Sequence, residues 1–263
     1  MGGDDAIKVG AGDNVIIGGL GADQITMGDG DNVVLGDSGY ATFDATSGKH
    51  LVVATLFGGA GVGGSRDTGT SSDDTINLGK GSNVVIGGAG ADSILFGATG
   101  SDVVIGDDGE ADFDSSGVLT DAKSMDAIYG GIDTIAGARD AQGRLTDGGS
   151  GGSTVIGGLY GDTIQLGGAG NTIIGDNGEA DFAGGMFKTT DGATGGDDVI
   201  TVSGGSNTIL GGWGADQITT TGTGGNVILG DNGQPCYGYG QWTRELHRRG
   251  GVLLLGAPPG PAR

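Results

Sequence analysis

The stretch GGLGADQIT, Gly18–Thr26, has glycine at its first, second and fourth positions, aspartate at its sixth and isoleucine at its eighth. The pattern returns as GGAGADSIL at 87–95 and as GGWGADQIT at 211–219, with weaker copies such as VGAGDNVII at 9–17. About sixteen copies fall in four blocks, near residues 1–37, 71–107, 131–176 and 194–231. Self-similarity at a short fixed period predicts a stacked repeat architecture.

The nonapeptide resembles the RTX (repeats-in-toxin, hemolysin-type) calcium-binding repeat, G-G-x-G-x-D-x-U-x, in which U is a large aliphatic residue. The resemblance implies an all-β fold, a parallel β-roll (β-solenoid) occupying residues 1–233. In such a roll the first six residues of each repeat form a turn and the last three form a short strand. Two repeats complete one coil of about eighteen residues, so every second copy stacks above its predecessor.

The residue types suit that geometry and a bound Ca²⁺. Glycine permits the positive φ angles and close backbone approach of tight turns. Turn carbonyls and the carboxylate at position six offer hard oxygen ligands, which Ca²⁺ prefers. Zinc or copper would need thiolate or imidazole, and both histidines, His50 and His247, lie outside the repeats. We therefore expect several calcium ions between stacked turns.

The residue at position six alternates along the chain. The first block reads Asp, Asn, Asp, Asn, and the fourth block does the same, whereas the third begins with a poorly matched copy at Asp133 and then a serine, Ser153. Alternate copies share one edge of a roll, so one edge carries aspartates and the other mostly asparagines. We predict strong calcium sites at the aspartates, and either weak sites or a structural amide ladder at asparagines such as Asn14 and Asn32. The predicted position-six ligands are Asp5, Asp23, Asp74, Asp92, Asp102, Asp162, Asp198 and Asp216.

Each block closes with a G-D-x-G tag, at residues 36–39, 106–109, 175–178 and 230–233. The aspartate of each tag either binds an additional ion or closes the turn. These tag aspartates are Asp37, Asp107, Asp176 and Asp231.

The strands that follow asparagine are apolar on both faces, as in VIIG, VVLG and TIIG, whereas those that follow aspartate have a single apolar face. A continuous outward apolar stripe requires a cover, provided either by the segments between blocks or by a second roll. We favour the segments between blocks; an uncovered stripe would instead support self-association. The stripe consists of Ile17, Leu35, Ile86, Ile174 and Leu210.

Three inserts separate the blocks, at residues 40–70, 110–130 and 179–193. They begin alike, with YATFD, EADFD and EADF, and continue with a glycine turn and an apolar return, which predicts β-hairpins. The recurring phenylalanines either cap the apolar sheet or anchor a solvated loop. They are Phe43, Phe113 and Phe182.

Charge is distributed unevenly in this chain of 263 residues with a net charge of −21. Residues 1–234 contain 32 acidic and 8 basic residues, and residues 235–263 contain one glutamate and four arginines. The acidity argues against nucleic acid as a partner, although it is also typical of halophilic proteins. The basic segment 234–263 is atypical, and a cap, a disordered end or a shifted reading frame would each explain it.

Membrane insertion is not expected, because no apolar run approaches ~18 residues. Met1 stands in the middle of a repeat, which suggests a piece of a longer protein. No H-E-x-x-H or G-x-S-x-G motif is present, so we expect no catalytic site. The preferred function is a calcium-binding structural or interaction module of a secreted or cell-surface protein, such as an adhesin, a surface-layer component or an extracellular-matrix filament. The alternative is the C-terminal repeat region of a secreted RTX enzyme or toxin.

Overall fold

The computed structural model describes residues 2–55, 72–125, 128–145 and 152–234. Every regular element in these ranges is a strand. None of the residues described forms a helix long and apolar enough to cross a membrane. The predicted basic segment lies outside this part of the chain except for Gln234.

The first sheet, sheet A, consists of the strands that follow the position-six aspartates. Its eight strands are all parallel and stack in chain order, with Ile7 opposite Ile25 and Ile25 opposite Ile76. The isoleucine of each repeat therefore forms a continuous column. The strands are β1 (Ala6–Lys8), β3 (Gln24–Thr26), β7 (Thr75–Asn77), β9 (Ser93–Leu95), β13 (Thr134–Ala136), β15 (Thr163–Leu166), β19 (Val199–Val202) and β21 (Gln217–Thr220).

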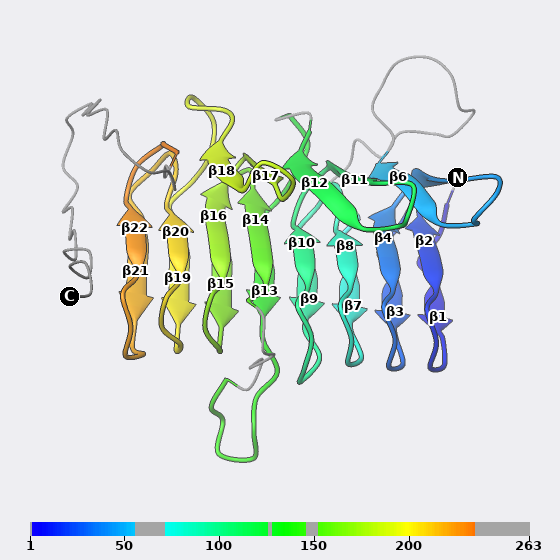
Figure 1. The fold of residues 1–263 in the computed structure, drawn as a ribbon, viewed down its shortest axis with the longest axis horizontal. Coiled ribbons are helices and arrows are strands. Elements are labelled where there is room, and N and C mark those ends of the chain that lie inside the picture. The colour runs from blue at the N-terminus through cyan, green and yellow to red at the C-terminus, as the bar shows by residue number, and fades with distance from the viewer. Residues whose placement is uncertain (1, 56–71, 126–127, 146–151, 235–263) are drawn as a thin grey trace, which may run out of the picture.

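The second sheet, sheet B, is formed by the alternate repeats and is also parallel and eight-stranded (Figure 1). Each coil contributes one strand to each sheet, which gives eight coils from one end of the roll to the other. Its strands are β2 (Val15–Gly19), β4 (Val33–Asp37), β8 (Val84–Ile86), β10 (Val103–Ile105), β14 (Thr154–Gly158), β16 (Thr172–Asp176), β20 (Thr208–Leu210) and β22 (Val227–Leu229).

The main core lies between sheets A and B. Ile25, Ile76 and Ile164 from sheet A meet Val34 and Ile173 from sheet B, and all five are fully buried. These aliphatic side chains are removed from water in every coil, which drives the stacking. The fold prediction, an all-β parallel β-roll, is thereby confirmed.

The inserts form a third sheet, sheet C, rather than separate loops. Three hairpins pair side by side into one antiparallel six-stranded sheet in the order β18-β17-β12-β11-β6-β5. Figure 1 shows them gathered along sheet B. The hairpins are β5 (Gly39–Phe43) with β6 (His50–Thr55), β11 (Gly109–Phe113) with β12 (Leu119–Ser124), and β17 (Gly178–Asp181) with β18 (Met186–Thr189).

Sheet C covers the outer face of sheet B. Leu35, Ile86 and Ile174 are completely buried in a second core beneath Val53 and Ala111 of the hairpins. The inserts therefore provide the cover, as favoured from the sequence, and the stripe is not available for association where they lie. Ile17, in the first coil, remains 39% exposed.

Two of the three insert phenylalanines pack against the apolar sheet, which is one of the two alternatives that the sequence left open. Phe113 and Phe182 contact the second core, but Phe43 is 47% exposed. Phe43 lies on the outermost strand of sheet C, where the pairing with β6 shifts register. Its ring contacts His50, with centroids 5.2 Å apart. Of the two alternatives from the sequence, capping does not hold for Phe43, because this edge of sheet C has no strand beyond it among the residues described.

Candidate metal centre

The aspartates at position six form a ladder along one edge of the roll, which we call the Asp ladder. The backbone N–H of each aspartate donates to Oδ1 of the aspartate in the next coil, at 2.7 Å from Asp5 to Asp23 and at 3.1 Å from Asp198 to Asp216. The stacked turns thus hold the carboxylates in a line, one per coil. The full order is Asp5, Asp23, Asp74, Asp92, Asp133, Asp162, Asp198 and Asp216.

In six of these carboxylates the second oxygen has no protein partner among the residues described. Oδ2 is buried without a hydrogen bond in six of them, although a buried carboxylate oxygen normally accepts at least one. A regular row of such oxygens indicates that something other than protein satisfies them. The six residues are Asp23, Asp92, Asp133, Asp162, Asp198 and Asp216.

A glycine α-carbon lies directly against each of these oxygens. A Cβ built on Gly87 would lie 2.4 Å from Oδ2 of Asp92 and 2.1 Å from the carbonyl oxygen of Gly106 in the next coil. A Cβ on Gly18 would meet Asp23 and Gly36 in the same way. The first glycine of the repeat is therefore required because carboxylate and carbonyl oxygens converge beside it.

Burial and mutual repulsion raise the pKa values of these groups. Burial raises the pKa of Asp92 well above its ordinary value, and the negative charge of Asp133 raises it further. Burial, together with repulsion from Asp133 and Asp107, does the same for the pKa of Asp162. Burial raises the pKa of Asp198 to about 8, and nearby Asp176 contributes. Such a cluster is stable near neutral pH when a bound cation compensates the charge.

Asp133 was not among the predicted ligands, yet it is completely buried in the middle of the Asp ladder. Its Oδ1 accepts the N–H of Asp92 at 2.8 Å, and its own N–H donates to Asp162 at 2.8 Å. The glycine pattern before it is interrupted by the second insert, which hid the match. The D-x-I spacing to Ile135, which pairs with Ile94 in β9, is the signal that could have added Asp133 to the predicted ligands.

The opposite edge carries a different ladder, here called the Asn ladder. Nδ2 of Asn32 donates to Oδ1 of Asn83 at 2.9 Å and to the carbonyl of Gly30 at 2.9 Å. Asn171 and Asn207 repeat the amide contact at 3.0 Å. These amides satisfy one another, so the structural ladder, one of the two alternatives from the sequence, is what the fold contains.

Asp102 belongs to the Asn ladder and not to the Asp ladder. It accepts N–H and Nδ2 hydrogen bonds from Asn83, at 2.9 and 2.8 Å, and its own N–H donates to Ser153. Burial raises the pKa of Asp102 to about 6. The structure therefore separates this predicted ligand from the other seven by the width of the roll.

The tag aspartates mark turns that the inserts split. Each insert interrupts a turn of the Asp-ladder edge, and the tag aspartate bridges the gap. Asp107 accepts the N–H of Gly131, on the far side of the insert, at 2.9 Å, and also the N–H of Leu159. Asp176 likewise accepts from Gly196 and Trp213. Both carboxylates are thus occupied in closing turns.

The two remaining tag aspartates, Asp37 and Asp231, differ from each other in their surroundings. Asp37 accepts the N–H of Ala89 in the next coil at 2.6 Å, a contact of the same kind. Asp231 lies exposed beyond β22, the last described strand. The structure therefore brings Asp37, Asp107 and Asp176 to the same edge as the Asp ladder, with Asp231 at its end.

The Asp ladder suits Ca²⁺. Among the described residues no three His, Cys, Asp or Glu side chains converge on a point, so a cation there takes much of its coordination from backbone carbonyls. Ca²⁺ accepts carbonyl and carboxylate oxygens in a flexible shell of six to eight. Each orphaned Oδ2, with the glycine carbonyl next to it, provides the start of such a shell.

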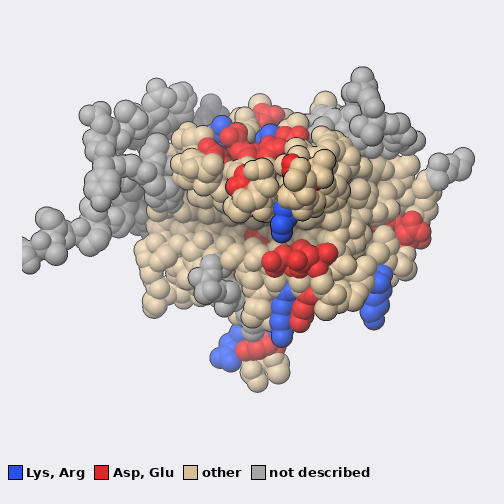
Figure 2. Space-filling model, turned by 45° about the vertical axis from the view of Figure 1, so that its right-hand side comes forward, with Lys and Arg blue, Asp and Glu red and all other residues tan. Residues whose placement is uncertain are grey.

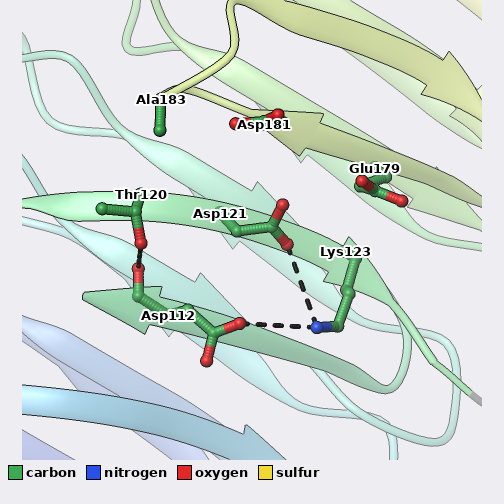
Figure 3. Close-up of a pocket in the computed structure, with 7 residues that line it drawn as sticks. All are labelled: Asp112, Thr120, Asp121, Lys123, Glu179, Asp181 and Ala183. Atoms are coloured by element: carbon green, nitrogen blue, oxygen red, sulfur yellow. Dashed lines mark hydrogen bonds and ion pairs between the residues drawn. The ribbon is translucent and has the colours of Figure 1, made fainter. Parts of the chain in front are cut away.

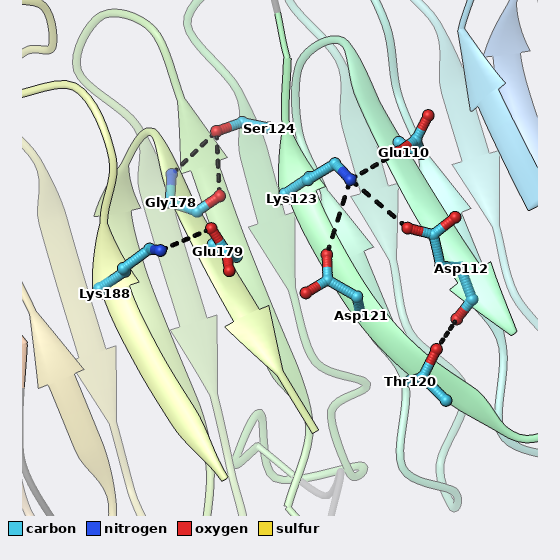
Figure 4. Close-up of polar contacts among 9 residues, drawn as sticks. All are labelled: Glu110, Asp112, Thr120, Asp121, Lys123, Ser124, Gly178, Glu179 and Lys188. Carbon is cyan, nitrogen blue, oxygen red and sulfur yellow. Dashed lines mark hydrogen bonds and ion pairs between the residues drawn. The ribbon is translucent and has the colours of Figure 1, made fainter. Parts of the chain in front are cut away.

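A second group of acidic residues lies on the outer face of sheet C, where Figure 2 shows red side chains gathered with a few blue ones. Nζ of Lys123 lies 2.6 Å from Glu110, 3.4 Å from Asp112 and 4.0 Å from Asp121 (Figure 4). The shallow pocket of Figure 3 opens here, lined by Asp112, Thr120, Asp121, Lys123, Glu179, Asp181 and Ala183. Lys123 thus neutralises several carboxylates across paired strands.

We expect Lys123→Met to destabilise sheet C by roughly 1–2 kcal/mol, because it leaves three carboxylates facing one another. Thermal unfolding of the calcium-loaded protein measures the effect. Lys188→Met is the matched control, because Nζ of Lys188 pairs with a single carboxylate among the described residues, that of Glu179 at 2.8 Å, so this variant should lose less stability. Equal losses in the two variants would contradict a special role for Lys123.

Comparison with protein families identifies the repeats. The family model of the RTX calcium-binding nonapeptide repeat, which comprises four copies, matches residues 1–34, 68–98 and 192–221. This repeat is a structural calcium-binding unit rather than a catalytic one, and it is typically found in secreted proteins. Comparison with curated protein sequences and with solved structures gives no significant match.

Proposed function

We propose that this chain, whose RTX repeats make it a calcium-binding module, serves as a calcium-stiffened spacer or interaction module of a secreted or cell-surface protein. The observation that supports this most directly is the row of buried, unpartnered Oδ2 atoms along the Asp ladder. Calcium ions between successive turns would be held by Asp23, Asp92, Asp133, Asp162 and their equivalents, together with the glycine carbonyls beside them.

Binding and folding are coupled in this proposal. The ions neutralise stacked carboxylates that otherwise repel one another, so calcium stabilises the rolled state over the unfolded chain. Extracellular calcium modules typically bind with dissociation constants of about 10⁻⁴–10⁻³ M. A roll of that affinity is unfolded at cytosolic calcium levels and folds after export, and its eight coils at ~4.8 Å form a rod of roughly 40 Å.

The tag aspartates and Asp102 have separate roles. Asp107 and Asp176 use both oxygens on backbone N–H groups, so they hold the split turns closed and add negative charge to the edge. Asp102 lies in the Asn ladder, where it accepts a hydrogen bond from Asn83, and it is not one of the calcium ligands in this proposal.

Asp133→Asn tests the proposal. It preserves an acceptor for the N–H of Asp92 and removes one charge, so we expect the loss of at least one bound ion and a calcium midpoint at least about tenfold higher. Equilibrium dialysis counts the ions, and circular dichroism gives the midpoint.

The matched control is Asn207→Ser, which places in the Asn ladder the residue type that occurs there at Ser153. It removes an amide contact and should lower stability without changing the ion count. An unchanged ion count in Asp133→Asn, or an equal loss in the control, would contradict the assignment of the sites.

A further inference from the structure

The Asn ladder contains one carboxylate among the side chains that the structure describes at its position-six residues, which we call rungs. Each rung before the last donates its backbone N–H to a side-chain oxygen of the next, in the order Asn14, Asn32, Asn83, Asp102, Ser153, Asn171, Asn207 and Asn226. Asp102 is only 3% exposed. A single ionisable group in a buried row of neutral ones needs a physical explanation, because burial disfavours its charged form.

The asparagine rungs use the two ends of the side-chain amide differently. Oδ1 of Asn83 accepts both the backbone N–H and Nδ2 of Asn32, at 3.1 and 2.9 Å. Nδ2 of an asparagine rung donates instead. That of Asn171 donates to the carbonyl of Gly167 in its own turn, at 2.8 Å, and to Oδ1 of Asn207, at 3.0 Å. The place occupied by Nδ2 is therefore surrounded by acceptors and suits a donor.

Asp102 fills the Oδ1 place of this pattern with one of its oxygens. Its Oδ1 accepts the backbone N–H and Nδ2 of Asn83, at 2.9 and 2.8 Å, as Oδ1 of an asparagine rung does. Its Oδ2 consequently takes the place that Nδ2 has in the other rungs. An ionised carboxylate can only accept hydrogen bonds, whereas a protonated one carries a donor. Only the protonated form of Asp102 thus reproduces the function of an asparagine.

The length of the turn does not require an aspartate at this rung. Asp102 follows Asn83 by nineteen residues, and Asn226 follows Asn207 by nineteen as well. Oδ1 of Asn226 accepts the N–H and Nδ2 of Asn207, at 2.9 and 3.2 Å. A coil of this length therefore accommodates asparagine, and the aspartate changes the chemistry of the rung and not its geometry.

The surroundings of Asp102 favour its protonated form in mild acid. Burial raises the pKa of Asp102 to about 6, hydrogen bonds from Asn83 oppose the shift, and the negative charge of Asp31, two coils away, adds to it. Neither adjoining rung titrates. The other charged groups in the turns before it, Asp29 and Lys80, are exposed, as is Asp31. Asp102 therefore changes its protonation state close to neutral pH, unlike an exposed aspartate.

We infer that Asp102 is a proton-operated rung of the Asn ladder. With a proton on Oδ2 it donates as asparagine does and closes the ladder. When the proton leaves to solvent, a negative charge faces the acceptors of the turn and the stacking of this coil weakens. The inference goes beyond the proposed function, because it needs no ion at the Asp ladder. Its sign follows from linkage: a pKa raised from 3.8 to about 6 gives stability that is complete below about pH 3.8 and is lost as the pH rises through about 6.

The test compares the calcium-saturated parent with Asp102→Asn in urea unfolding at pH 5 and pH 7.5. The Asp ladder is the same in both proteins, so its titration cancels. The ratio of the folding equilibrium constants, variant over parent, should rise about tenfold between the two pH values. Asn171→Asp is the reciprocal variant and should be destabilised at least about tenfold more at pH 7.5 than at pH 5. Asn171→Ser removes the amide without adding a charge, so its effect should not depend on pH.

Two results would overturn the inference. The first is a ratio for Asp102→Asn that stays the same at both pH values. The second is a smaller number of bound ions in this variant by equilibrium dialysis, because Asp102 would then be a calcium ligand. If Asn171→Asp does not fold, infrared difference spectra of the parent and Asp102→Asn decide: a protonated carboxyl band at pH 5 must occur in the parent alone. Failure of the proposed function would appear in Asp133→Asn and would leave these results unchanged.

Discussion

Chelation of calcium at pH 7.5 is expected to abolish most of the β-type circular dichroism, and acidification of the chelated protein to about pH 4 is expected to restore much of it. Burial raises the pKa of Asp176 to about 7 and that of Asp198 to about 8, and it raises those of Asp92, Asp133 and Asp162 well above their ordinary value of 3.8. A group with a raised folded-state pKa contributes stability below its unfolded pKa, and this stability is lost as the pH rises through the folded value. The metal-free roll should therefore weaken between about pH 4 and pH 8.

The magnitude follows from the number of carboxylates involved. Each pKa unit corresponds to about 1.4 kcal/mol, and a typical domain is stable by only ~5–15 kcal/mol. The free-energy cost of ionising several buried aspartates together exceeds that margin. Bound calcium removes this cost because it stabilises the ionised carboxylates. Chelator and acid titrations followed by circular dichroism measure both effects. A chelated protein that is most ordered at pH 7.5 would contradict this account of the Asp ladder.

Gly87→Ala is expected to lower stability by about 3 kcal/mol and to raise the calcium midpoint at least about tenfold. The new Cβ would lie 2.1 Å from the carbonyl oxygen of Gly106 and 2.4 Å from Oδ2 of Asp92. Overpacking against backbone cannot be relieved by a rotamer change, and it displaces the two oxygens assigned to the ion. Thermal unfolding at fixed calcium, together with a calcium titration, measures the two losses.

Gly10→Ala provides the control, in the repeat at residues 9–17. Nothing lies within 4 Å of a Cβ built on Gly10, and its backbone is outside the left-handed region. We expect little change, or a gain of ~0.4–1 kcal/mol from a less flexible unfolded chain. If both substitutions had the same effect, the requirement for glycine at Gly87 would be general to the turn and would not reflect the space beside the carboxylate.

The parallel β-roll was predictable from sequence because its determinants are local and repeated. Each nonapeptide carries its own turn glycines, its position-six residue and its aliphatic residue, so a single register applied along the chain places Asp23 and Asp92 on one edge. The same periodicity predicted that sheet B is apolar on both faces and requires a cover. These features depend on residues a few positions apart, which a sequence displays directly.

The tertiary structure decided what depends on segments far apart in the chain. The three hairpins join into one sheet because the second strand of each hairpin pairs with the first strand of the next, at separations of about sixty residues. Asp133 belongs to the Asp ladder because the chain returns to the roll after the second hairpin, in register with Asp92 and Asp162. The irregular sequence of its repeat does not show this. Asp102 leaves it because counting coils, and not residues, fixes the edge on which a repeat lies. Residue type and period determined the coil, whereas stacking determined which carboxylates face one another, since only the stacked coils bring them together.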